Sequence, residues 1–158
     1  MTVQVRRATL NDYPSIASIG RESQDLHAHA YPTIFQSETP GFAEEHVHSL
    51  IEDERSAAYV AEEDGYILGY VFLHAQRVSY QDIFQPRMVA EITDIAVAAQ
   101  ARRKGVGHFL FETALGWARH LHAERLELTV WEFNREAISF YESNGMRAIN
   151  RTMSLPLM

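Results

Sequence analysis

The spacing of apolar residues changes several times along the chain, and each change predicts a different element. Apolar and polar residues alternate over residues 3–6, which indicates a short strand. Cap-forming residues at 9–12 and Pro14 then start a helix that runs to about residue 27. Apolar positions between residues 41 and 54 fit a second helix. The first third of the chain is therefore expected to hold one strand and two helices.

The middle of the chain predicts three strands. Residues 57–61 and 66–75 are largely apolar, and the acidic turn between them ends in Gly65. Glycine readily takes the positive φ that a tight turn needs, so these two strands are expected to form a hairpin. Residues 88–97 form the next predicted strand.

The last third predicts a helix, a strand, a second helix and a final strand. Apolar residues recur every three or four positions over residues 105–122, as in a helix with one buried face. Alternation over residues 126–130 indicates a strand, and Asn134 can cap a helix that an Asn-Gly pair ends. Residues 146–157 complete the pattern as one last strand.

This order of elements predicts an α/β fold with a mixed, mostly antiparallel central sheet flanked by helices. The chain has no internal repeat, no low-complexity tract and no linker long enough to separate two domains. We therefore expect a single domain over residues 1–158.

Composition narrows the range of functions. The chain has a net charge of −7 and contains no cysteine. The absence of cysteine excludes disulfide scaffolds, cysteine-ligated metal sites and cysteinyl intermediates. Its start lacks the apolar segment of a secretory signal, and no apolar run approaches the ~20 residues of a membrane span. We expect a cytoplasmic protein that binds neither nucleic acid nor membranes. The acidity serves solubility first and slightly favours a cationic ligand.

The segment Gln100-Ala101-Arg102-Arg103-Lys104-Gly105-Val106-Gly107 lies between a predicted strand and a predicted helix. Two glycines allow close approach of the backbone to a ligand, and free amides at a helix N-terminus attract anions such as phosphate. The dinucleotide-binding pattern fails because Leu110 stands where its third glycine would be, and the P-loop pattern lacks Gly-Lys-Ser/Thr. Spacing alone leaves a plain helix N-terminus with solvated arginines equally open.

Two motifs in this order resemble the GNAT family of N-acetyltransferases. Arg102-x-x-Gly105-x-Gly107, after a strand that ends in Ile95-Ala96-Val97, resembles the pyrophosphate loop of that family. The second motif consists of Leu126-Glu127-Leu128-Thr129-Val130, Asn134, Ala137, Phe140-Tyr141-Glu142 and Asn144-Gly145. The resemblance covers residues from about 56 to 147 and departs at Met146, where the family usually has Phe.

The resemblance implies acetyl-CoA as co-substrate, a GNAT-like acyltransferase fold, and no metal. Loop amides would bind the pyrophosphate, and the preceding strand edge would pair with the pantetheine arm. The cofactor-binding residues implied in this way are Ile95, Ala96, Val97, Arg102, Arg103, Lys104, Gly105, Val106, Gly107, His108, Asn134 and Tyr141. For Asn134, a plain helix N-cap is the alternative role.

The resemblance also implies two catalytic residues. Tyr141 matches the tyrosine that commonly protonates the departing CoA thiolate, although helical spacing alone would make it a core aromatic. Glu91 is the candidate base for the attacking amine, because it is a charged residue in an apolar strand, eleven positions before Arg102. Asp94 is its rival, and a regular strand would put the two on opposite faces unless a bulge intervenes. A water chain is the third option for the base.

The 8 histidines include pairs spaced by two, and such spacing does not place both rings on one helix face for a metal. His27, Tyr31 and Phe35 are weighed instead as lining of an acceptor pocket.

The expected enzyme transfers an acetyl group to a primary amine by direct attack in a ternary complex. An inactive acyl-CoA sensor or interaction module is the alternative, and a nucleic-acid binder using residues 102–104 is disfavoured by the net charge.

The acceptor stays open among a small amine, a polyamine, an aminoglycoside, an amino acid, and a protein N-terminus or lysine. Dimers are common among relatives, so a homodimer is also considered.

Overall fold

The computed structural model describes residues 2–79 and 83–158. The chain forms two compact units, Met1–Leu128 and Thr129–Met158, and each is described by itself. None of the described helices is both long and apolar enough to span a bilayer.

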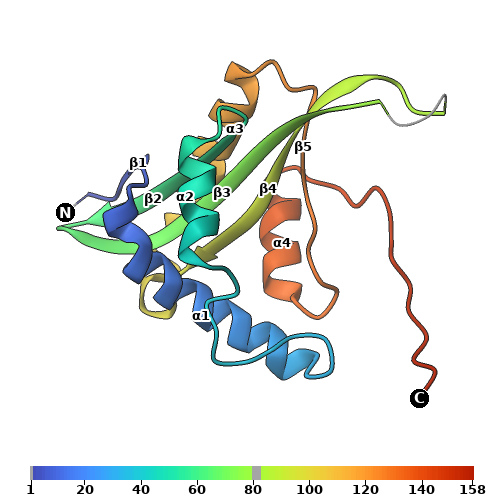
Figure 1. Cartoon of the computed structure of the whole chain (residues 1–158), viewed down its shortest axis with the longest axis horizontal. Helices are drawn as coiled ribbons and strands as arrows, with labels where there is room; N and C mark the ends of the chain where they lie inside the picture. Colours follow the sequence, from blue (N-terminus) through green and yellow to red (C-terminus); the bar gives the residue numbers. More distant parts are fainter. Residues whose placement is uncertain (1, 80–82) are drawn as a thin grey trace. The chain divides into compact units, whose positions relative to one another are not determined.

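The first unit is built on a five-stranded sheet whose spatial order follows the chain order (Figure 1). The strands are β1 (Gln4–Arg7), β2 (Ser56–Glu63), β3 (Tyr66–Val78), β4 (Arg87–Val97) and β5 (Arg125–Leu128). The first four pair antiparallel, and β5 runs parallel to β4. This mixed, mostly antiparallel sheet confirms the predicted fold class.

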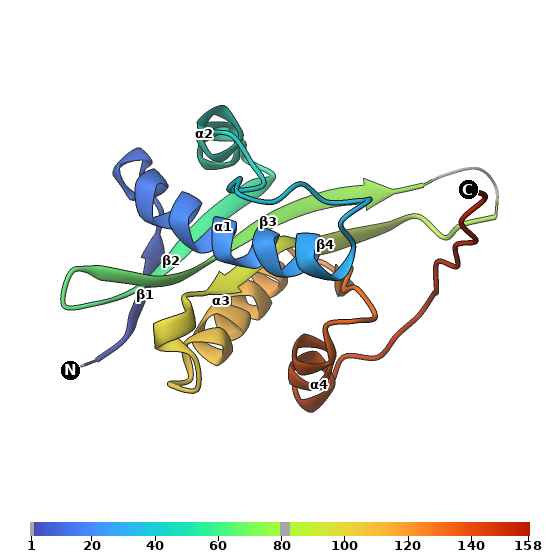
Figure 2. The same cartoon turned by 90° about the horizontal axis from the view of Figure 1, so that it is seen from below.

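Three helices cover the two faces of this sheet. Helices α1 (Tyr13–Ala30) and α2 (Glu44–Glu52) lie on one face, and α3 (Val106–His120) lies on the other (Figure 2). Short 3-10 turns at Leu10–Asp12 and Ala99–Ala101 precede α1 and α3. Alternate side chains of β3 point to opposite faces, so the same strand contributes to both halves of the core.

Glycines allow close packing on both faces. A Cβ on Gly69 of β3 would lie 2.8 Å from the Ala96 carbonyl oxygen and 3.3 Å from Val106 of α3. A Cβ on Gly20 of α1 would lie 2.7 Å from the Phe42 ring. Gly69 therefore lets the start of α3 approach the sheet beside the end of β4, because Gly69 pairs with Val97 there.

The second unit contains one helix, α4 (Arg135–Ser143). Asn134 caps it by accepting a hydrogen bond from the Ala137 amide at 3.2 Å, as the sequence predicted. Gly145 ends it with φ of 91°, and the Met146 amide donates to the Tyr141 carbonyl at 3.0 Å. The predicted strand over residues 146–157 is wrong, because this segment forms no strand and residues 147–158 are all exposed. An extended segment becomes a strand only when a neighbouring backbone accepts and donates its hydrogen bonds.

Candidate active site

The connection from β4 to α3 is held from behind by short contacts. The Ala98 amide donates to the Leu68 carbonyl at 2.8 Å, and the Ala101 amide donates to the Ala98 carbonyl at 2.9 Å. Glu22 of α1 accepts a hydrogen bond from the Ala99 amide at 2.9 Å. Ala98 and Ala101 are buried, whereas the residues that follow are exposed. The loop is thus fixed to the sheet while its outer side faces solvent.

The N-terminus of α3 presents free backbone amides. Gly105, the N-cap residue, has φ of 79° and no side chain to cap the helix. The first intrahelical bond runs from the Phe109 amide to the Gly105 carbonyl at 3.1 Å, so the amides before Phe109 have no helical acceptor. Arg103 also has positive φ, at 63°, which turns the loop toward the helix start. Free amides at the positive end of a helix dipole are suited to an anion, so this geometry is consistent with the predicted pyrophosphate loop.

Three basic side chains surround this helix start. Arg102, Arg103 and Lys104 are exposed. Within residues 2–79 and 83–158, no carboxylate lies at ion-pair distance from any of the three. They are therefore available to an anionic ligand, which fits the pyrophosphate implied by the sequence.

The edge of β4 that leads into this loop is open. Pairing between β4 and β5 runs from Val89 with Arg125 to Ile92 with Leu128 and ends there. Residues 95–97 continue β4 and pair only with β3 in the described part of the first unit. Their other edge can hydrogen-bond an extended ligand, as a strand edge does. The predicted residues 95–97 and 102–108 thus lie before and after one short turn, residues 98–101, in which the amides of Ala98, Ala99 and Ala101 are already hydrogen-bonded within the protein.

A β-bulge decides how the candidate bases are oriented. Asp94 pairs with Phe72 and Ile92 pairs with Leu73, so Thr93 is the extra residue on β4. Glu91 pairs with His74, which lies on the same face of β3 as Phe72. The bulge therefore places Glu91 and Asp94 on the same face, whereas a regular strand would separate them. Both point to the face covered by α1 and α2.

Tyr70 of β3 forms a buried polar contact on this face. Its hydroxyl donates to Asp94 Oδ2 at 2.8 Å, and Tyr70 is fully buried. Burial raises the pKa of the Asp94 carboxyl, and the hydrogen bond from Tyr70 and the nearby His27 and His46 partly oppose this. Burial, then the Asp94 carboxylate, raises the pKa of the Tyr70 phenol, so Tyr70 remains the donor. Sequence reasoning missed this pair, because its two residues are 24 positions apart and no spacing rule links them.

Aromatic rings enclose the Tyr70–Asp94 pair. The Phe42 ring centroid lies 5.9 Å from that of Tyr70 and 5.3 Å from that of Phe72. The His46 ring of α2 lies 6.2 Å from Phe72. Phe72 is also the cross-strand neighbour of Asp94, so this cluster of rings lies next to the carboxyl whose pKa burial raises.

Glu91 has a different environment. It is half-buried, and its neighbours across the strands are His74 on β3 and Glu127 on β5. Glu127 keeps Oε1 buried with no hydrogen-bond donor among the described residues, and Arg125 Nε lies 3.5 Å away. Together with Asp94, these carboxylates give this face of the sheet a negative character suited to a cationic group.

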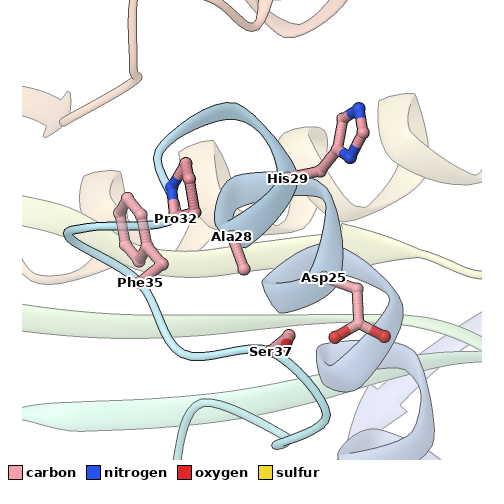
Figure 3. A pocket seen from close by; sticks show the side chains of 6 residues that line it. All are labelled: Asp25, Ala28, His29, Pro32, Phe35 and Ser37. Carbon is pink, nitrogen blue, oxygen red and sulfur yellow. The ribbon is translucent and has the colours of Figure 1, made fainter.

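A hollow of about 460 Å³ lies beside the C-terminal half of α1 (Figure 3). Its lining consists of Asp25, Ala28, His29, Pro32, Phe35 and Ser37. Of the three residues predicted to line an acceptor pocket, Phe35 contributes directly. The His27 ring lies 5.2 Å from Phe35, and Tyr31 ends α1 by donating its amide to the His27 carbonyl. An acceptor role for this hollow stays a prediction.

The remaining predicted residues belong to the second unit. Tyr141 lies on α4, half-buried, with its ring centroid 5.5 Å from that of Phe140. Asn134 uses its side chain for the helix cap already described. Their roles toward the cofactor stay predictions. Within the two described ranges, no three His, Asp or Glu side chains are arranged to hold a metal ion.

Comparison with known proteins gives consistent matches. The family model described as the acetyltransferase (GNAT) family matches residues 22–146. An uncharacterized N-acetyltransferase, YhfO of Bacillus subtilis, is 28% identical over 143 residues, which are 90% of this chain and 89% of that protein. A putative [ribosomal protein bS18]-alanine N-acetyltransferase of B. subtilis is 30% identical over 63% of this chain and 60% of its own length. A crystal structure of a variant of the BH1408 protein from Bacillus halodurans has a TM-score of 0.94 at 28% identity, covering 98% of this chain and 99% of that one.

Proposed function

We propose a specific reaction for this chain, which belongs to the GNAT family of acetyltransferases: transfer of an acetyl group from acetyl-CoA to a primary amine by direct attack in a ternary complex. The chain is an acetyl-CoA-dependent acyltransferase. The observation that carries the proposal is the open edge of β4 followed, after one short turn, by the free amides at the start of α3.

The chain offers a separate group for each part of the co-substrate. The amides of residues 103–108 and the side chain of Arg102 would hold the pyrophosphate. The backbone of residues 95–97 would pair with the amide groups of the pantetheine arm. Asn134 would contact the same arm from the second unit. No metal is needed for this binding, because the helix start and the basic residues supply the positive charge.

Deprotonation of the amine is the first chemical requirement, since only the free amine is nucleophilic. Glu91 is proposed as the base. Asp94 remains its rival, because the bulge at Thr93 brings both to the same face. Asp94 holds a proton more readily because burial raises its pKa, and Tyr70 fixes its orientation. A water chain between the amine and either carboxylate is compatible with this arrangement.

The transfer step then balances simply. The amine lone pair forms a bond to the thioester carbonyl carbon, and a β4 amide near Ile95 stabilises the oxyanion. The carbon–sulfur bond breaks as the carbonyl re-forms, and Tyr141 gives its proton to the departing thiolate. The nitrogen loses its second proton as the amide forms, and that proton returns through water to the Tyr141 phenolate. Because the chain has no cysteine, the acetyl group has no cysteinyl acceptor on the enzyme, which favours direct attack.

The acceptor is proposed to be cationic. The carboxylates of Glu91, Asp94 and Glu127 support this, as does the net charge of −7. One relative is named a putative [ribosomal protein bS18]-alanine N-acetyltransferase and another an N-alpha-acetyltransferase, and these names support a protein N-terminus as one acceptor class. A small amine or polyamine is the other.

We also propose a cytoplasmic, single-domain protein that binds neither nucleic acid nor membranes and forms a homodimer.

Calorimetric titration with acetyl-CoA tests the proposal. Saturable binding followed by amine-dependent release of free CoA thiol supports acetyl transfer. Binding without release toward any amine class would favour the inactive sensor, and no binding at millimolar acetyl-CoA would refute the assignment of the loop.

A further inference from the structure

Four polar residues form a row across the sheet. Each is the direct cross-strand neighbour of the next, in the order Ser56 on β2, His74 on β3, Glu91 on β4 and Glu127 on β5. Direct partners in an antiparallel pair share a face and have β-carbons about 4.5–5.5 Å apart. The row therefore lies on the face covered by α1 and α2, and the candidate base Glu91 has His74 beside it.

Ser56 and Asp53 hold one side of the His74 ring. Ser56 Oγ lies 2.9 Å from His74 Nδ1 and 2.7 Å from Asp53 Oδ2. Asp53 Oδ2 lies 3.8 Å from the same ring nitrogen. The Arg55 amide donates to Asp53 Oδ1 at 3.0 Å and so fixes this carboxylate. Because the hydroxyl and the carboxylate approach the same nitrogen, the cluster is not a nucleophilic serine triad, in which they occupy opposite nitrogens.

This cluster determines which nitrogen of His74 carries the hydrogen. Hydrogen bonds from the Arg55 amide and the Ser56 hydroxyl lower the pKa of Asp53, so Asp53 is ionised and only accepts. The single hydroxyl hydrogen of Ser56 therefore goes to Asp53, and the Ser56 oxygen accepts from Nδ1–H of His74. Neutral His74 thus keeps a lone pair on Nε2. The Asp53 carboxylate beside Nδ1 also stabilises the ring after Nε2 takes up a proton.

The Nε2 atom of His74 is open to a proton. Among residues 2–79 and 83–158, no group forms a hydrogen bond with it, and the side chain is 36% exposed. One water can bridge such neighbouring polar side chains. Asp94 differs, because the Tyr70 hydroxyl donates to its Oδ2 and a cluster of aromatic rings lies next to it. Of the two candidate bases, Glu91 is the one with a proton acceptor beside it that reaches solvent.

We propose that His74 is a positioning residue for acetyl transfer that acts through Glu91. This inference rests on the proposed function with Glu91 as the base. An N–H bond of the acceptor ammonium breaks as Glu91 takes the proton, and Glu91 passes that proton through one water to Nε2 of His74. The imidazolium then gives the proton to bulk water, so that Glu91 is again a carboxylate and His74 is again neutral. The Nδ1–H bond to Ser56 persists throughout.

Turnover of matched variants tests this role. Glutamine cannot take up a proton, so His74→Gln should lower kcat by about 10- to 100-fold while the Kd for acetyl-CoA stays within about twofold. His48→Gln changes an exposed histidine that contacts Glu52 on α2, and it should leave kcat unchanged. In a Glu91→Gln background, His74→Gln should lower kcat no further, because His74 acts only through Glu91. An unchanged kcat in His74→Gln, or the same loss in the Glu91→Gln background, would overturn the proposal.

Nitrogen NMR of His74 tests the geometry without any reaction. In the wild type, neutral His74 should carry its hydrogen on Nδ1, and Ser56→Ala should shift the hydrogen toward Nε2 because the acceptor for Nδ1–H is lost. A hydrogen on Nε2 in the wild type would refute the role of His74 and leave acetyl transfer untouched. A wild type that releases no CoA with any amine would refute the proposed function, and this role with it.

Discussion

Replacement of Gly105 by glutamate should strongly weaken the binding of acetyl-CoA. The structure distinguishes two physical effects of this substitution, backbone strain and charge repulsion. Gly105 is the N-cap of α3 with φ of 79°, and a Cβ there would meet only Phe109, at 3.9 Å. The substitution therefore creates no steric clash. It does place an L side chain in the left-handed region, and it places a carboxylate at the amides that would hold the pyrophosphate.

The two effects have different magnitudes and different readouts. A left-handed conformation costs a residue with a side chain about 1–2 kcal/mol of folding free energy. For a chain of this size that lowers the Tm by about 2–8 °C. Two unit charges ~4 Å apart at a partly screened surface repel by up to about 4 kcal/mol. If solvent removes up to half of this, the Kd for acetyl-CoA rises by roughly 30- to 1,000-fold.

Two control variants isolate these effects. Gly105→Ala should lower the Tm by about the same 2–8 °C while changing the Kd little, because it has the strain without the charge. Gly116→Glu adds the same carboxylate to the same helix, at an exposed position where a Cβ meets nothing within 4 Å. It should leave the Kd unchanged and raise helix stability by up to about 1 kcal/mol.

Isothermal titration calorimetry with acetyl-CoA and thermal melts of the three variants supply all the numbers. A wild-type Kd in Gly105→Glu would refute the placement of the anion site. Equal weakening in Gly116→Glu would mean that added negative charge anywhere on the protein opposes the cofactor, and the local argument would fail.

Three further predictions follow from single residues. Tyr141→Phe should lower kcat at least tenfold while the Kd for acetyl-CoA stays within about twofold, because the phenol acts on the leaving thiolate; an unchanged kcat would make it a structural aromatic. The pH–rate profiles of Asp94→Asn and Glu91→Gln should identify the base. A carboxylate base must be ionised, so the rate falls as the pH drops through its pKa. Only the variant that lacks the true base should lose this acidic limb of the profile. Burial raises the pKa of Asp94, so its limb would lie above the ordinary range for a carboxyl, and superimposable profiles for both variants would indicate water. Hydrogen bonds from Arg6 lower the pKa of Asp12, so this pair stabilises the fold above pH 3.8 and loses that contribution as pH falls through the lowered pKa. Asp12→Asn should therefore lower the free energy of unfolding by about 1–2 kcal/mol at neutral pH. In urea melts at a series of pH values, the variant should lose less stability in acid than the wild type, and an equal loss would contradict this prediction.

Local chemistry made much of the site predictable. The position of Gly105 at the start of a helix was predictable because it depends only on neighbouring residues in the chain. Gly105 is indeed the N-cap of α3. The helix at Asn134 begins and ends at the predicted residues for the same reason, because caps depend on neighbours within about six positions.

Contacts between distant segments were not predictable in this way. The partner of Asp94 is Tyr70, and nothing in the spacing of the two residues joins them. The bulge at Thr93 depends on how β4 pairs with β3, since a bulge exists only relative to a neighbouring strand. The predicted strand over residues 146–157 is wrong for a related reason: alternation favours an extended segment, but a strand also needs hydrogen bonds to a neighbouring strand, and this segment forms none.

The sequence by itself therefore determined the order of the elements as far as α4, the class of the fold and the location of the glycine-capped helix start that is proposed to bind an anion. Periodicity, caps and turn residues act over a few positions, and these features need no more. Only the tertiary structure decided that Glu91 and Asp94 share a face, and that the edge of β4 opens after Ile92. Register between strands is set by packing across the sheet, and that packing joins residues that the chain keeps far apart.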